Sequence, residues 1–164
     1  MAFRISGLPA APFAHLFGLD DNALAEFGAI RYIADCKPGF PCRVTLEDVE
    51  PGDRVLLLHY VHQPANTPYR ASHAIFVREG ASLTASFIDE VPASLRTRLL
   101  SVRAFDANDM LVDADIIVGA DLEALVARFF SKQVISYLHV HNAKAGCYAA
   151  RVDRFESSTI DATA

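Results

Sequence analysis

Two histidines separated by one residue, His139 and His141, stand in the stretch YLHVHNAKAGCYAARV (137–152). Successive side chains of a β-strand point to opposite faces, so both imidazoles share one face with Tyr137. Two imidazoles on one strand face can ligate a single metal ion if a third ligand comes from elsewhere in the chain. The candidates for that third ligand are His59, His62 and His73.

The same pair has a second interpretation. Asn142, Ala143 and Lys144 follow the histidines, so the carboxylate that would complete a cupin-like metal site is missing. We therefore expect no metal and no other cofactor. On this interpretation, His139 and His141 are half-exposed side chains on the polar face of a sheet.

Cys147 is a candidate nucleophile in the same stretch. An imidazole such as that of His141 can hold a nearby thiol as the thiolate, and the Asn142 amide can orient that imidazole. The alternative is that Cys147 is a small buried side chain without reactivity. The sequence leaves open whether the protein is an enzyme.

The loop HQPANTPYRASH (62–73) gathers polar side chains between two expected strands. An arginine offers a rigid fork of donors that can hold a carboxylate or phosphate. Our first hypothesis is a small polar or anionic ligand bound in a cleft lined by 39–43, 62–73 and 141–148. The candidate ligand-binding residues are Arg43, Tyr69, Arg70, Ser72, Asn142 and Tyr148.

Two further hypotheses stay open beside this one. One is an enzyme that depends on a metal held by His139 and His141 or on the Cys147 thiol. The other is a structural module that self-associates through an exposed sheet edge, with a homodimer as the simplest product.

Periodicity along the chain predicts an α+β fold, mostly antiparallel sheet with six to eight strands and one or two packed helices. The clearest helix is LEALVARFFSK, with Asp121 as its N-cap. Asp21 or Asn22 is expected to cap a short helix, and the Thr45–Asp48 spacing indicates a single helical turn. The length predicts one domain over residues 1–155 and a flexible polar tail over 156–164.

Composition narrows the functional classes. The 164-residue chain carries a formal net charge of −5, and its lysines and arginines are scattered, so we expect no nucleic-acid partner. No apolar run approaches the roughly 20 residues of a membrane helix, and the N-terminal residues show no signal peptide. Three cysteines without a secretion signal indicate reduced thiols and a cytoplasmic location. We expect Cys36 and Cys42 to be free or buried.

Five segments together resemble the bacterial family known as domain of unknown function 1203, and the likeness spans nearly the whole chain. The family has no assigned activity, so the resemblance implies no chemistry. It implies a poor role for His73 as an essential ligand, because relatives often carry Gly-Pro where this chain has His73-Ala74. The segments are GFPCR (39–43), EPGDRVLLL (50–58), TPYRAS (67–72), IFVR (75–78) and HNAKAGCYAARV (141–152).

Overall fold

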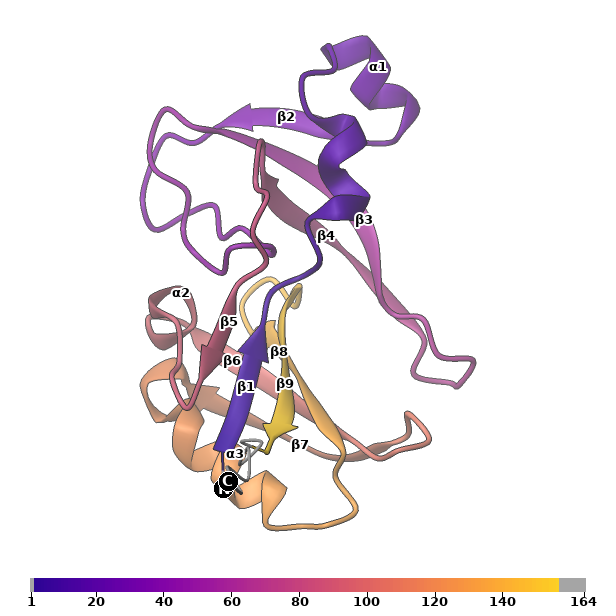
Figure 1. Cartoon of the computed structure of the whole chain (residues 1–164), viewed down its shortest axis with the longest axis vertical. Coiled ribbons are helices and arrows are strands. Elements are labelled where there is room, and N and C mark those ends of the chain that lie inside the picture. Colours follow the sequence, from indigo (N-terminus) through magenta and orange to yellow (C-terminus); the bar gives the residue numbers. More distant parts are fainter. Residues whose placement is uncertain (1, 157–164) are drawn as a thin grey trace, which may run out of the picture.

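A computed structural model describes residues 2–156 as two antiparallel sheets and a few short helices (Figure 1). This confirms the predicted α+β class. The larger sheet has six strands in the order β5-β1-β9-β8-β6-β7, and the smaller sheet has the order β2-β3-β4. The six strands of the larger sheet are β1 (Ala2–Ser6), β5 (Ser86–Ile88), β6 (Leu99–Phe105), β7 (Leu111–Val118), β8 (Tyr137–Asn142) and β9 (Tyr148–Phe155).

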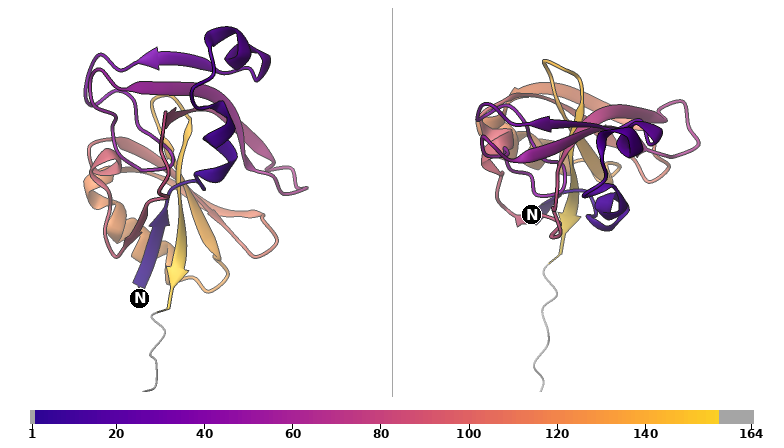
Figure 2. Two further views of the ribbon diagram at one scale, coloured as in Figure 1. Left: turned by 45° about the horizontal axis from the view of Figure 1, so that its top comes forward. Right: turned by 90° about the horizontal axis from the view of Figure 1, so that it is seen from above.

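The smaller sheet consists of β2 (Ile30–Ile33), β3 (Arg54–Gln63) and β4 (Ala71–Arg78). It lies across one end of the larger sheet, and the β8–β9 turn reaches toward it (Figures 1 and 2). The described strands exceed the expected range by one, because the three-residue β5 falls in a stretch without clear periodicity. The expected polar tail covers residues 156–164, and residues 157–164 lie outside the described part of the chain.

The helices are short. They are η1 (Ala11–Leu16), α1 (Asp21–Glu26), α2 (Ala93–Arg96), η2 (Gly119–Asp121) and α3 (Leu122–Phe130). No helix among residues 2–156 combines the length and apolar character needed to cross a bilayer.

Helix α3 forms where the periodicity predicted it and packs its apolar stripe against one face of the larger sheet. Asp121 precedes the helix as expected, but its side chain makes no capping hydrogen bond. The residues of α3 buried in this core are Leu122, Leu125, Val126, Phe129 and Phe130.

Two local predictions were wrong. The side chain that caps α1 is that of Asp20, one residue earlier than expected, and it accepts from Ala23 N at 2.9 Å. Thr45–Asp48 forms no helical turn. Instead, Asp48 pairs with Arg98 at 2.6 Å, and its loop folds back on Pro41 through an isolated bridge. An ion pair between residues far apart in sequence leaves no local signal.

The two faces of β8 bury different side chains. Leu138 and Val140 lie in the core that contains α3. His139 and His141 lie on the opposite face, which packs against β3 and β4, and they are only 2% and 0% exposed. The expected half-exposed polar face is therefore wrong, because the second sheet covers it.

The hairpin that joins β8 to β9 closes at Gly146, whose φ of 77° is the positive value predicted for this glycine. The sequence left open whether Tyr148 or Arg151 joins the histidine face. Both do, since Tyr148 pairs with His141 and Arg151 pairs with His139 across a register shift. The shift leaves one extra residue on β9, which is a β-bulge.

Candidate metal centre

Four imidazoles gather between the two sheets. His62 lies on β3, His73 on β4, and His139 and His141 on β8. The His62 ring centroid lies 5.0 Å from that of His73, 5.0 Å from that of His141 and 5.6 Å from that of His139. One nitrogen from each of His62, His73 and His141 lies within 4.8 Å of the other two. This is a spacing at which a single ion can be ligated by three histidines.

A bulge in β3 turns His62 toward this group. The register between β3 and β4 shifts by one residue between Tyr60 and Gln63. Consecutive residues His62 and Gln63 are therefore both buried, while Val61 is exposed. Regular alternation cannot bury two successive side chains on one face, so the bulge accounts for this placement. The buried Gln63 amide donates to the Tyr137 hydroxyl at 2.7 Å and joins the hairpin arm to the larger sheet.

The orientation of His141 is fixed by the hairpin turn. Its Nδ1 donates to the carbonyl oxygen of Gly146 at 3.1 Å, which assigns the proton of the neutral ring to Nδ1. Its Nε2 is buried and has no hydrogen-bond partner among the described residues. Metal-ligating histidines commonly donate one ring nitrogen to a carbonyl in this way while the other binds the ion.

His62 and His73 are joined directly. Nε2 of His62 and Nδ1 of His73 lie 3.0 Å apart and share one proton. Nδ1 of His62 and Nδ1 of His139 are buried and have no hydrogen-bond partner within residues 2–156. A buried polar atom without a partner costs roughly 1–3 kcal/mol, so the unpartnered nitrogens of His62 and His141 favour a bound ligand.

Electrostatics keep these rings uncharged at neutral pH. Burial lowers the pKa of His139 to about 3, aided by His62 and Arg151, and burial together with Arg103 lowers the pKa of His141 to about 3. Burial, His73 and Arg103 lower the pKa of His62 to about 4. Burial and Arg103 also lower the pKa of His73. Neutral imidazole is the form that binds metal ions.

Tyr148 forms one wall of the group. Its ring lies nearly parallel to that of His62, at 4.9 Å and 9°, and faces His139 edge-on at 5.2 Å. The side chain is buried, and burial raises the pKa of its hydroxyl. The predicted ligand-binding tyrosine therefore contacts the imidazoles and shields them from water.

Arg43 and Cys147 form a second contact at the hairpin turn. The buried Arg43 donates from Nη2 to Cys147 Sγ at 3.1 Å, from Nε to Tyr148 O at 2.6 Å, and from Nη1 to Pro41 O. The Asn142 amide donates to the same sulfur at 3.5 Å. Arg43, Asn142, Cys147 and Tyr148 thus lie together, and the Arg43 donors are already engaged by the protein.

The remaining predicted ligand-binding residues lie on the β3–β4 hairpin. Tyr69 is exposed, with its ring 6.2 Å from that of Phe105, and Arg70 is exposed and donates to Pro64 O at 2.5 Å. Ser72 lies 2.8 Å from His59 Nε2 on the exposed side of the hairpin. His59 therefore faces away from the imidazole group, and the candidates from the other segments that join His141 are His62 and His73.

The thiols agree with the sequence-based expectation. All three cysteines are free, with Cys36 exposed and Cys42 buried.

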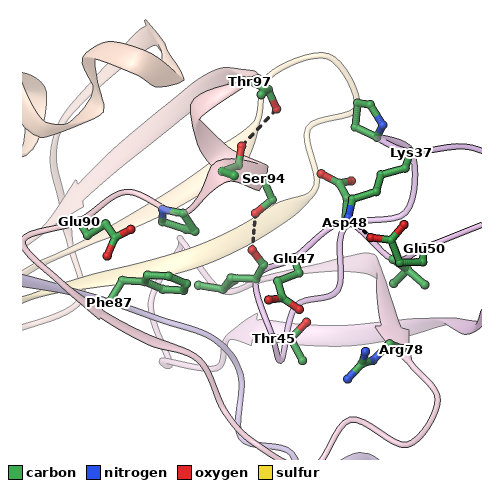
Figure 3. A pocket seen from close by; sticks show the side chains of 15 residues that line it. Lys37, Thr45, Glu47, Asp48, Glu50, Arg78, Phe87, Glu90, Ser94 and Thr97 are labelled. Carbon is green, nitrogen blue, oxygen red and sulfur yellow. Dashed lines mark hydrogen bonds and ion pairs between the residues drawn. The ribbon is translucent and has the colours of Figure 1, made fainter.

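A well-defined cavity lies elsewhere. It has a volume of about 570 Å³ and opens between the 37–50 loop and α2 (Figure 3). Lys37 and Glu50 pair on one side of it, and Glu90 lies near Phe87 on the other. Its lining includes no residue of 62–73 or 141–148, so this cavity is separate from the histidines.

Sequence reasoning missed one residue beside the histidines. Arg103 pairs directly with His139 across β6 and β8, and directly opposed residues point to the same face. Its charge acts on His62, His73 and His141 as well. A lone arginine in an alternating strand gave no signal until the strand order was known.

Comparison with known proteins gives a family and no activity. A family model described as "Protein of unknown function (DUF1203)" matches residues 39–154, which include His62, His73, His139 and His141. No curated protein and no solved structure matches the chain.

Proposed function

Because this chain belongs to the DUF1203 family, to which no function is assigned, we propose from the site itself that it is a metal-binding protein. His62, His73 and His141 are the proposed ligands of one divalent first-row transition-metal ion. The observation that carries the proposal is the convergence of their nitrogens within 4.8 Å, from three strands in two sheets. His139 lies beside this group and is not one of the proposed ligands.

Several features favour an ion over a purely structural polar cluster. The buried Nε2 of His141 has no partner in the described part of the chain, and the Gly146 carbonyl holds its other nitrogen in the ligating tautomer. The low pKa values of His62 and His141 mean that protons do not compete for these ligands near neutral pH. Imidazole nitrogens suit zinc, copper, iron and nickel better than calcium or magnesium.

Three protein ligands leave at least one coordination position for a small molecule. Metal sites of this kind are typical of catalytic centres, whereas closed structural sites use four protein ligands. A bound divalent ion would supply Lewis acidity to an oxygen in that position. The chain's own contribution is to orient the imidazoles, keep them neutral, and exclude water with Tyr148.

The test is calorimetric titration of chelator-treated protein with zinc chloride. We expect one ion per chain and a gain of about 2.7 kcal/mol in unfolding free energy at a hundred times the dissociation constant. His73→Ala removes a ligand that is only partly buried, so the variant should fold and bind zinc far more weakly. His59→Ala is the matched control on the same hairpin, and it should bind zinc like the unmodified protein.

The proposal fails if zinc neither binds nor stabilises the protein. It also fails if His59→Ala weakens zinc binding as much as His73→Ala does, because the effect would then lie outside the three-histidine group. Circular dichroism of both variants verifies that each is folded before the titration.

A further inference from the structure

The charge around the histidines is unusual for a cation site. None of the four imidazoles makes a hydrogen bond or ion pair with a carboxylate of residues 2–156, and the leading charged influences on them are arginines and one another. Three neutral ligands leave the full charge of a divalent ion uncompensated. A buried, uncompensated charge costs several kcal/mol, so the site needs an anion that the described chain does not provide.

Three arginines approach the group, and two of them are occupied. Arg43 donates to two carbonyls and to Cys147 Sγ. Arg151 is paired with Asp153 at 2.9 Å and lies over the Tyr137 ring. The guanidinium of the third, Arg103, makes no hydrogen bond and no ion pair with any residue between 2 and 156.

Arg103 lies on the histidine face of the larger sheet. Its neighbour across the sheet is His139, and Ser101, two residues earlier, pairs with His141. Arg103 and His73 are partly exposed, while His139 and His141 are buried. Of the three proposed ligands, His73 is therefore the most accessible to an incoming molecule, and Arg103 is accessible as well.

We propose that the site takes a small oxyanion, a carboxylate or a phosphate-like group, held by the Arg103 fork and by the metal ion together. The inference rests on the proposed metal-binding function and names the class of ligand that fills the open coordination position. A planar guanidinium matches two oxygens of such a group, and a contact from one of the group's oxygens to the metal adds to it.

The inference has a thermodynamic consequence that distinguishes it from simple metal binding. Arg103 repels a bare divalent cation, and an oxyanion removes this repulsion while it gains two positive partners. Metal and oxyanion should therefore tighten each other's binding by the same factor, and couplings of this kind are typically 5- to 150-fold.

The experiment measures zinc affinity by calorimetry at constant ionic strength in chloride, in acetate and in sulfate, with correction for zinc bound by free anion. We expect acetate or sulfate to strengthen zinc binding roughly tenfold relative to chloride. The acetate arm reports a carboxylate ligand, and the sulfate arm reports a tetrahedral, phosphate-like ligand.

Arg103→Met separates the role of the charge from that of the fold. In chloride this variant should bind zinc at least as tightly as the unmodified protein, since a repelling charge is gone. In acetate or sulfate it should show no enhancement. Arg128→Met, which removes an exposed arginine on α3, should keep the full enhancement.

The calorimetric results distinguish failure of the oxyanion ligand from failure of the metal site. Zinc binding of equal strength in all three salts overturns the oxyanion ligand and leaves the metal site standing. Enhancement that survives in Arg103→Met, or that is lost in Arg70→Met instead, overturns the assignment to Arg103. No zinc binding in any salt overturns the metal site and the oxyanion together.

Discussion

Strand β8 presents aliphatic side chains to the core that contains α3 and imidazoles to the second sheet, and both faces are buried. Leu138 and His139 are adjacent and almost equally shielded from water, at 0% and 2% exposure. Burial of the first stabilises the fold, because apolar area leaves water. Burial of the second opposes folding, because Nδ1 of His139 loses water and gains no described partner. The two faces show that burial alone does not identify what a side chain contributes.

The largest expected effect exploits the low pKa values on the imidazole face. A histidine whose pKa is lower when folded than when unfolded leaves stability independent of pH above the unfolded pKa of roughly 6.5. Below that pH the unfolded state takes up the proton first, so the protein loses stability as pH falls. With pKa values of about 3 for His139 and His141, these two rings alone should cost metal-free protein about 4 kcal/mol between pH 7 and pH 5, and the lowered pKa of His62 adds to this loss. Urea unfolding at both pH values, with chelator present, measures the difference. Equal stability at the two pH values would contradict neutral, buried rings.

The next effect tests the apolar face. Leu138→Ala removes a fully buried side chain from the α3 core and should cost about 3 kcal/mol of unfolding free energy. The expected loss is independent of pH between 5 and 7, unlike the loss on the other face. Urea midpoints of this variant and the unmodified protein at pH 7 give the value, and a cost below about 1 kcal/mol would mean that the aliphatic face is loosely packed.

The smallest expected effect is on the imidazole face, at the residue next to Leu138. His139→Leu replaces a buried ring that has an unpartnered nitrogen with an apolar side chain. The variant loses contacts with the surrounding rings, and it no longer bears the desolvation cost of the ring nitrogen. These two effects should nearly cancel, so we expect the unfolding free energy to change by no more than about 1 kcal/mol at pH 7. At pH 5 the variant should be more stable than the unmodified protein by about 2 kcal/mol.

His139→Leu also tests whether the His139 ring is one of the metal ligands. Zinc stoichiometry should stay at one per chain, because His139 is not among the three converging residues. A loss of zinc binding in this variant would place His139 among the ligands.

Local patterns predicted the elements that carry the site more readily than the site itself. The alternation of YLHVHN placed Tyr137, His139 and His141 on one face, and the apolar spacing of LEALVARFF placed α3. These features depend only on residues adjacent in sequence, so periodicity reveals them.

The features that complete the site depend on tertiary structure. Strand order decides three of these features. They are the second sheet that covers His139 and His141, the bulge that buries His62, and the approach of Arg103. The resemblance to relatives also argued against His73, whereas the structure brings its Nδ1 to 3.0 Å from His62. No pattern within one segment encodes these pairings, because they join strands that are far apart along the chain.

The two bulges bear on which changes of chain length the protein can tolerate. One extra residue stands on β3 between Tyr60 and Gln63, and another, Ala149, stands on β9. Deleting Val61 would restore a regular ladder in which His62 alternates with Tyr60 and Gln63 and therefore faces away from His73. A single-codon deletion on β3 would thus keep the strand pairing while removing His62 from the imidazoles, whereas deletion of Ala149 would leave Tyr148 and Arg151 opposite the same histidines.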